Sequence, residues 1–165
     1  MNQHAVMESP IGDIIIVRGP KGITRIALAH QRHLPELSSF GPRDDGSSRD
    51  AQEQLDQYFS GERVQFDLPL FVRGTPFQRS VWRCLSTIPY GTTWSYGQLA
   101  RVIEQPLAAR AVGLANGRNP HAIVVPCHRV IGANGSLTGY AGGVEAKSFL
   151  LHHESLRSRV DVVSS

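Results

Sequence analysis

The sequence predicts a mixed α/β protein in which a strand-rich N-terminal part with one helix precedes a mostly helical C-terminal part. Short apolar runs separated by Gly and Pro turn signals fill the first thirty residues, which is typical of a β-meander. Apolar residues recur at helical spacing in most segments after residue 48. A chain of 165 residues can form one or two small domains with cores of their own. We expect an N-terminal domain over residues 1–68, a C-terminal domain over residues 69–155 and a flexible tail over residues 156–165.

The predicted N-terminal domain contains a meander and one helix. The meander is expected to have strands at residues 5–9, 14–18 and 23–29. A helix over residues 48–60 presents an apolar face at helical spacing, and a glycine follows it as a stop signal. The residues of that face are Ala51, Leu55, Tyr58 and Phe59. His30 and His33 have no cysteine near them, so we interpret them as loop histidines rather than metal ligands.

Several helices are predicted in the C-terminal domain. The first begins after Thr75, which can cap it, with a proline at the first helical position. Cys84 lies on the apolar face of this helix and is interpreted as part of the core. Ser95 can cap a second helix, and residues 107–116 form a third that is rich in Ala and Gly. Two short helices across a tight turn predict a helix-turn-helix, although many helical hairpins bind nothing.

The charge is unevenly distributed along the chain. Residues 1–69 hold seven Lys or Arg against ten Asp or Glu, a net charge of −3. Residues 70–144 hold seven arginines against one glutamate, a net charge of +6. A segment this basic indicates a polyanionic partner, and nucleic acid is the first candidate. A solubilising surface beside an acidic domain is the alternative.

Composition also limits the compartment. No stretch is apolar and long enough to span a membrane, and the N-terminus lacks the pattern of a signal peptide. The two cysteines, Cys84 and Cys127, are too few for a disulfide framework. We therefore expect a soluble protein of a reducing, cytoplasmic compartment with no membrane partner.

The chemistry is predicted to centre on Cys127. The apolar residues 122–126 lead into it and predict a buried strand that delivers a thiol to a site. His128 follows directly, but adjacent residues of a strand point to opposite faces, so a water or a turn would have to join the two side chains. A thiolate needs a base or a positive field nearby to act as a nucleophile. Taken alone, a Cys-His pair is more often structural than catalytic.

Several motifs together carry a family resemblance. The Pro-Cys-His-Arg-Val stretch at residues 126–130 resembles the active-site signature of the O6-alkylguanine-DNA alkyltransferases, also called methylated-DNA–protein-cysteine methyltransferases. Further similar motifs lie at residues 74–79, 88–91, 96–100, 109–113 and 137–143. The resemblance implies a ribonuclease-H-like α/β scaffold domain at the N-terminus. It also implies a C-terminal domain that carries the helix-turn-helix and the active-site cysteine.

The resemblance implies direct reversal of DNA alkylation. An alkyl group would move from O6 of guanine in double-stranded DNA to Cys127, once per protein molecule, after minor-groove binding and base flipping. O4-alkylthymine as a second substrate is left open. No cofactor is implied, and no zinc, because family members that hold structural zinc use cysteines that this chain lacks before Cys84. A monomer is expected, with cooperative assembly on DNA left open.

The same resemblance assigns roles to individual residues. The catalytic set is Cys127, His128, Glu154, Tyr96 and Asn119, in which Glu154 orients His128 and His128 holds the water that deprotonates the thiol. The set that binds the alkylated base is Tyr96, Val130, Tyr140, Ala141 and Lys147. The DNA-binding set is Arg110, which would fill the space of the flipped nucleotide, with Ala109, Ala111, Gly113, Arg118 and Ser95.

Two other functions compete with alkyl transfer. A non-enzymatic lesion sensor or DNA-binding regulator would use the same fold, but relatives of that kind replace the cysteine that is present here as Cys127. A cysteine hydrolase built on Cys127 and His128 would turn over repeatedly and would have no use for the basic segment.

Overall fold

The chain folds into two compact units. The computed structural model describes residues 1–137 and 139–164, and the side chains of all of these except 157–164. One unit comprises Met1–Arg73 together with Pro120–Val124, and the other comprises Gly74–Asn119 and Val125–Ser165. The short segment just before Cys127 thus belongs to the first unit, which the sequence did not indicate. Thr138 of the predicted glycine-rich loop and Ser165 of the predicted tail lie outside the described residues.

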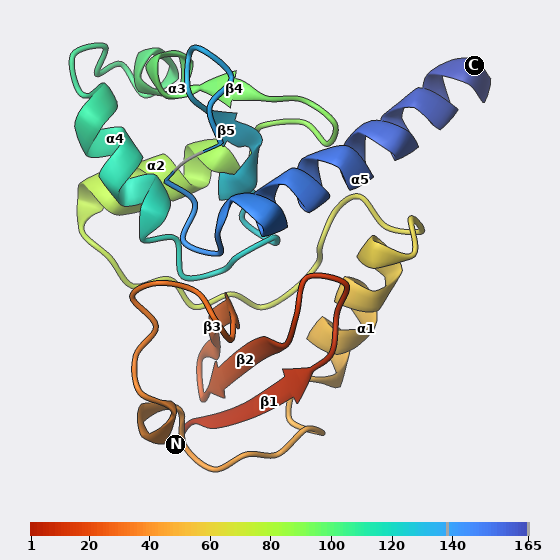
Figure 1. The fold of residues 1–165 in the computed structure, drawn as a ribbon. Helices are drawn as coiled ribbons and strands as arrows, with labels where there is room; N and C mark the ends of the chain where they lie inside the picture. Colours follow the sequence, from red (N-terminus) through yellow and green to blue (C-terminus); the bar gives the residue numbers. More distant parts are fainter. Residues whose placement is uncertain (138, 165) are drawn as a thin grey trace. The chain divides into compact units, whose positions relative to one another are not determined.

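The N-terminal unit is an antiparallel meander with one α-helix (Figure 1). Its elements are β1 (Gln3–Met7), β2 (Ile14–Gly19), β3 (Gly22–Leu28), η1 (Leu37–Phe40) and α1 (Arg49–Phe59). Two short segments cover the outer edge of β3, because Leu70 pairs with Ile23 and His121 pairs with Ile26, both in parallel. Gly22 makes the first pairing possible: its φ is +135°, and a Cβ there would lie 2.4 Å from the Pro69 carbonyl oxygen.

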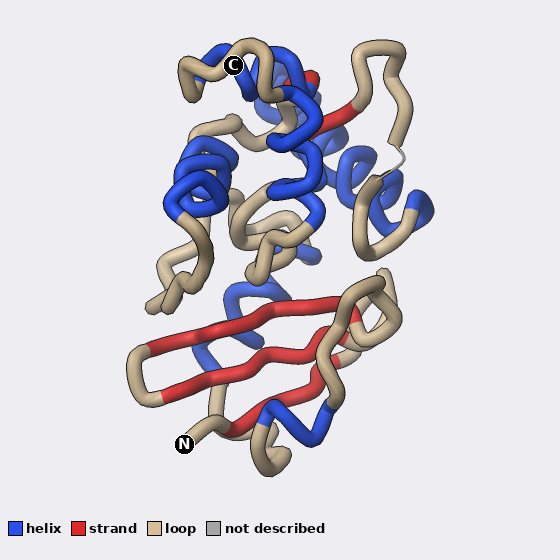
Figure 2. The backbone as a smooth tube through the Cα atoms, turned by 90° about the vertical axis from the view of Figure 1, so that its left-hand side faces the viewer, coloured by secondary structure: helices blue, strands red, loops and turns tan. Residues whose placement is uncertain are grey.

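Strand β2 is buried on both faces. Ile15 and Val17 pack with Phe40 of η1 on one face. Ile14 and Ile16 alternate with them and are fully buried on the other face, the side on which α1 lies (Figure 2). The predicted meander and the predicted helix are therefore both confirmed.

The C-terminal unit is mostly helical. Its elements are α2 (Pro76–Leu85), β4 (Trp94–Ser95), α3 (Tyr96–Val102), α4 (Ala109–Gly117), η2 (Cys127–Arg129), β5 (Val130–Ile131) and α5 (Val144–Ser164). Both predicted N-caps form capping boxes, with Thr75 Oγ1 3.1 Å from Gln78 N and Ser95 Oγ 3.1 Å from Gln98 N. In the core, Trp82 Nε1 of α2 donates a 2.9 Å hydrogen bond to the Ala115 carbonyl of α4.

Two segments of this unit differ from expectation. Residues 156–164 continue α5 instead of forming the predicted tail, since no Gly or Pro interrupts the helix after residue 144. The chain from 88 to 96 contains a short strand, β4, that pairs in parallel with β5. This pairing places Trp94 opposite Val130, and so brings the start of α3 beside the residues that follow Cys127.

Candidate functional site

The backbone before Cys127 is a series of turns, so the predicted strand over residues 122–126 is wrong. Cys127 N donates to the Val125 carbonyl at 2.8 Å across a γ-turn, and Pro126 at its centre has φ −83° and ψ 63°. Ile123 has φ 72°, which is rare for a β-branched residue. A short apolar run indicates burial but does not distinguish a strand from buried turns, which is why the prediction failed.

Cys127 and His128 instead lie on one turn of 3-10 helix, η2. The Cys127 residue is 5% exposed and His128 is fully buried. Side chains of adjacent residues point to opposite faces in a strand, but this rule does not apply to a turn of 3-10 helix.

A buried ionic network holds His128. Glu154 of α5 accepts a hydrogen bond from His128 Nε2 at 2.7 Å and from Arg129 Nε at 2.7 Å. Arg129 Nη2 reaches the same carboxylate at 3.1 Å, and its Nη1 donates to the Ile88 carbonyl at 2.7 Å. The three ionisable side chains are all buried, so each depends on the others for its polar contacts.

This network favours a neutral imidazole and an ionised carboxylate. Burial lowers the pKa of His128 and outweighs the opposite effect of Glu154. Burial alone would raise the pKa of Glu154, but the hydrogen bonds and charges of His128 and Arg129 outweigh it and hold that pKa below its usual range. A neutral His128 that donates from Nε2 has a free lone pair on Nδ1, and Nδ1 has no hydrogen-bond partner among the described residues.

Opposing effects act on the pKa of the Cys127 thiol. Burial raises its pKa, while the Asn119 side chain and the charge of Lys147 pull it down in part. Lys147 is fully buried on α5, and its Nζ donates a hydrogen bond to the Val130 carbonyl. Burial lowers the pKa of Lys147, and the nearby Cys127 opposes that change.

Two asparagines fasten the loop that carries the thiol. Asn119 Nδ2 donates to the Val125 carbonyl at 2.7 Å, and Asn116 Nδ2 lies 3.4 Å from the Cys127 carbonyl. Sequence reasoning singled out Asn119 but not Asn116, which is 2% exposed on α4. Its place at helical spacing from Val112 is the signal that could have found it, because an amide on a buried helix face needs polar partners.

Tyr96 lies between α4 and the glycine-rich loop. A Cβ on Gly113 would lie 3.7 Å from its ring, and a Cβ on Gly139 would lie 3.4 Å from its hydroxyl oxygen. Burial raises the pKa of Tyr96, the charge of Cys127 raises it further, and the Asn116 side chain opposes both. Tyr140 is buried, and burial raises its pKa well above the usual value. The predicted base-binding residues Val130, Tyr140 and Lys147 are therefore buried in the same unit as Cys127, with Ala141 half-buried beside Tyr140.

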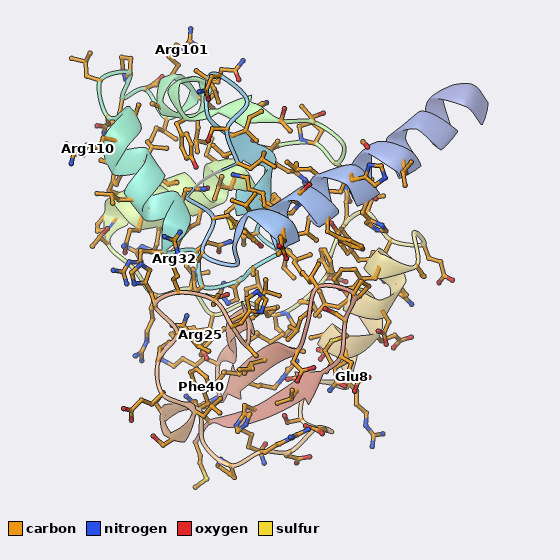
Figure 3. All side chains as sticks on the ribbon, in the orientation of Figure 1. Glu8, Arg25, Arg32, Phe40, Arg101 and Arg110 are labelled. Carbon is orange, nitrogen blue, oxygen red and sulfur yellow. The ribbon has the colours of Figure 1, made fainter. Side chains whose placement is uncertain are left out.

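The predicted DNA-binding residues differ in exposure. Arg110 and Ala111 are exposed on α4, and Arg118 is exposed just after it. Figure 3 shows Arg110 pointing away from α4 and Arg101 pointing away from α3. The three others, Ser95, Ala109 and Gly113, are half-buried, and the Ser95 hydroxyl is used in the cap of α3.

The described part of the chain holds no group of three or more His, Cys, Asp or Glu arranged for a metal ion. Within the same residues, no helix combines the length and the apolar character needed to cross a bilayer.

Both units match models of one protein family. Residues 3–72 match the family model "6-O-methylguanine DNA methyltransferase, ribonuclease-like domain", and residues 76–156 match "6-O-methylguanine DNA methyltransferase, DNA binding domain". A methylated-DNA–protein-cysteine methyltransferase of Mycobacterium tuberculosis is 48% identical over 162 residues, which is 98% of each chain.

Solved structures give the same result. The crystal structure of the Mycobacterium tuberculosis O6-methylguanine methyltransferase superposes with a TM-score of 0.89 at 48% identity, covering 95% of this chain and 94% of that one. A structure of Mycobacterium tuberculosis OGT in complex with DNA has the same TM-score and identity and covers 94% of each chain. With both domains matched in order and nearly the whole length aligned, this chain belongs to the O6-methylguanine-DNA methyltransferase family.

Proposed function

We propose that this protein repairs DNA by moving the methyl group of O6-methylguanine onto Sγ of Cys127. The observation that carries the proposal is a buried thiol on the same helical turn as a histidine that Glu154 orients, in a chain of this family. The relatives named above are methylated-DNA–protein-cysteine methyltransferases, and one was crystallised with DNA.

The reaction is a displacement at carbon. The Cys127 thiolate attacks the methyl carbon, so that an S–C bond forms while the C–O6 bond breaks and its electron pair stays with guanine. A proton from the Tyr96 hydroxyl neutralises the departing ring. The product is a thioether, which water does not cleave, so each molecule acts once.

His128 supplies the path for the thiol proton. With Nε2–H donated to Glu154, Nδ1 can accept a proton through one water from Cys127. Glu154 stabilises the imidazolium that results, while Arg129 keeps the carboxylate ionised. The lone pair of Nδ1 and the depressed pKa of Glu154 support this order of transfer.

The alkylated base would be recognised by buried and half-buried groups around the thiol. We assign Tyr96, Tyr140 and Ala141 to the pocket, with Ala141 N–H as the donor to O6. The Val130 carbonyl already accepts from Lys147, and its second lone pair remains for the exocyclic amine. Asn119 holds the thiol loop in place rather than touching the base.

Helix α4 would carry the DNA contacts. Arg110 is exposed, and Leu114, one turn later, is 71% exposed. A flat cation beside an apolar side chain suits insertion into a minor groove from which a base has left. Base flipping is required because a cysteine this buried cannot reach O6 in a stacked duplex.

The monomer is the unit of reaction in this proposal, since one cysteine takes one methyl group. Both cysteines are unpaired, which supports a reducing, cytoplasmic setting.

Intact mass and peptide mapping test the proposal directly. After mixing with duplex DNA that contains one O6-methylguanine, we expect one added methyl group on Cys127 and one repaired lesion per protein molecule. Tight binding to the lesion with no change in mass would contradict methyl transfer and favour a lesion sensor. More than one repaired lesion per protein molecule would exclude a cysteine that acts only once.

Arg110→Ala is expected to slow repair of a methylated duplex roughly tenfold to a hundredfold, because losing a stacked side chain costs about 1–3 kcal/mol. Reaction with free O6-benzylguanine, which needs no flipping, should be unchanged. Arg101→Ala is the matched control, an exposed arginine on α3 that is expected to change mainly the salt dependence. Equal losses of Arg110→Ala on both substrates would exclude the insertion role.

Lys147→Gln is expected to move the rising limb of the pH–rate profile with O6-benzylguanine to higher pH. Glutamine can still donate to the Val130 carbonyl, but it removes the charge that lowers the pKa of Cys127. A higher thiol pKa leaves less thiolate at neutral pH, so the rate there should fall. Lys21→Gln, at the other lysine of the chain, should leave the profile in place.

A further inference from the structure

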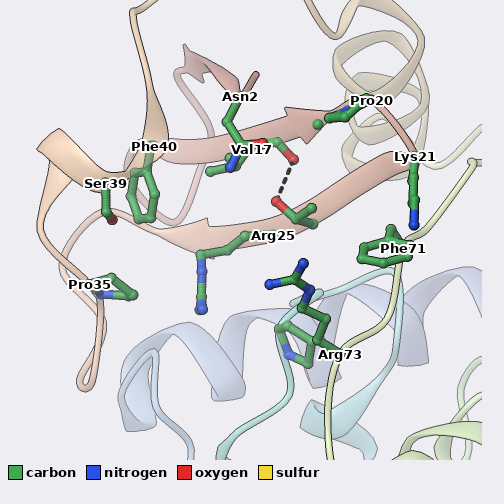
Figure 4. Close-up of a pocket in the computed structure, with 13 residues that line it drawn as sticks. Asn2, Val17, Pro20, Lys21, Arg25, Pro35, Ser39, Phe40, Phe71 and Arg73 are labelled. Carbon is green, nitrogen blue, oxygen red and sulfur yellow. Dashed lines mark hydrogen bonds between the residues drawn. The ribbon is translucent and has the colours of Figure 1, made fainter.

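A cavity of about 380 Å³ is lined by residues of the N-terminal unit, and none of them is assigned to alkyl transfer (Figure 4). Its volume falls in the range of small-molecule sites, about 300–1,000 Å³. The wall is formed partly by Val17, Phe40 and Phe71 and partly by cationic side chains. The proposed function uses this unit only as a scaffold, so the cavity has no role in it.

The charged part of the wall is entirely positive. Lys21, Arg25 and Arg73 line the cavity, and no acidic residue does. Figure 4 shows Arg25 reaching in from β3 and Arg73 reaching in from the segment that follows Phe71. Three cations without a carboxylate repel one another, and an anion bound among them would relieve that repulsion.

Arg25 is the cation of this wall whose side chain makes no polar contact with the described protein. Its backbone pairs with Val17 in the sheet, but its half-buried guanidinium has neither a hydrogen-bond nor an ion-pair partner among the described residues. Burial lowers the pKa of Arg25, and it also lowers the pKa of the nearby His121, which the charge of Arg25 lowers further. Arg18 on the neighbouring strand, by contrast, is paired with Asp50 at 2.6 Å. A half-buried guanidinium that makes no ion pair within the protein is available to bind an anion in the cavity.

The aromatic side chains of the cavity wall indicate that the ligand also has an apolar part. Lys21 Nζ and Arg73 Cζ each lie 5.6 Å from the centre of the Phe71 ring, which fixes both cations beside an aromatic face. Phe40 closes another side, and Asn2 and Ser39 add polar groups. A phosphate suits the arginine pair, and a planar ring suits the aromatic wall.

We propose that this cavity binds a nucleotide, with the phosphate held by Arg25 and Arg73 and the base against Phe40 and Phe71. The nucleotide is either free or part of a DNA single strand, and both present the same phosphate and ring. Such binding would add a second nucleic-acid site to a unit that otherwise serves as scaffold.

Amide shifts in the full-length protein test the proposal. Titration with deoxyadenosine monophosphate should move the backbone resonances of Thr24 and Phe71 in a saturable, one-to-one manner. Arg25→Gln should weaken binding roughly tenfold or more, because a hydrogen bond to a charged group is worth about 1.5–3 kcal/mol. Arg73→Gln should act in the same way, which guards against a folding defect in one variant.

Further measurements test the role of the nucleotide ring, the role of the arginine charges and the source of the nucleotide. Arg43→Gln removes an exposed arginine of the same unit that is paired with Asp45, and it should leave the affinity unchanged. Equal affinity for inorganic phosphate would overturn the nucleotide assignment, and an absence of shifts at the cavity would overturn the site. A thymidine tetranucleotide that binds more tightly than the mononucleotide identifies a DNA strand as the source, and weaker binding identifies a free nucleotide. Arg25→Gln should keep methyl transfer intact, so the two proposals fail independently.

Discussion

Cys127→Ala is expected to abolish methyl transfer while binding to methylated duplex DNA persists. Alanine removes the thiol that forms the S–C bond in the proposed reaction, and loss of a nucleophile commonly costs at least about 10⁴-fold in rate. The mutation takes away one sulfur from a buried site and leaves the His128–Glu154–Arg129 network complete. Intact mass after reaction with O6-methylguanine DNA, together with a binding titration on the same duplex, measures both effects.

Cys84→Ala is the matched control for this prediction. Cys84 lies half-buried on α2, and burial raises its pKa, so it is a poor nucleophile. We expect full transfer in Cys84→Ala, with the methyl group on Cys127. Repair that survived in Cys127→Ala would falsify the assigned nucleophile, and loss of DNA binding would indicate that the thiol is structural.

Glu154→Ala is expected to lower the free energy of unfolding of the C-terminal unit by about 3–5 kcal/mol, the usual cost of removing one partner of a buried ion pair. The mutation leaves the buried Arg129 charge without its carboxylate and leaves His128 Nε2 without its acceptor. Transfer should also slow, because His128 loses its fixed tautomer. Both tryptophans, Trp82 and Trp94, lie in this unit, so their fluorescence in a urea titration reports the unfolding.

The control on the same helix is Glu145→Ala. Glu145 is exposed in the first turn of α5, and its removal should change the free energy of unfolding by no more than about 0.5 kcal/mol. A comparable loss of unfolding free energy in the two variants would mean that α5 is sensitive to any loss of charge. The His128–Glu154–Arg129 network would then contribute no more to stability than a surface charge.

Acidity supplies a further check on Glu154. Its pKa is lower in the folded protein than in the unfolded chain, so the carboxylate stabilises the fold fully above its ordinary pKa of about 4.3, and this stabilisation is lost as the pH falls below that value. The difference in unfolding free energy between the parent and Glu154→Gln should therefore be largest near neutral pH and shrink in acid. A difference that stayed constant down to pH 3 would show that packing, and not charge, accounts for the loss.

Local signals in the sequence were sufficient for most of the elements. Short apolar runs separated by Gly and Pro turn signals predicted the meander, and helical spacing predicted α1. Thr75 and Ser95 predicted the starts of α2 and α3, because N-capping depends only on residues three positions apart. The motif around Cys127 indicated the family, which both domain matches confirm.

Contacts between distant residues were decided by the tertiary structure. The family resemblance implied that Glu154 orients His128, and the structure places the two side chains 2.7 Å apart. That Arg129 binds the same carboxylate had no signal in the sequence. The turns before Cys127 were unpredictable because apolar residues report burial and not backbone shape. The unpaired Arg25 in its cavity could not be foreseen either, since the partner of a charged side chain depends on which segments the fold brings beside it.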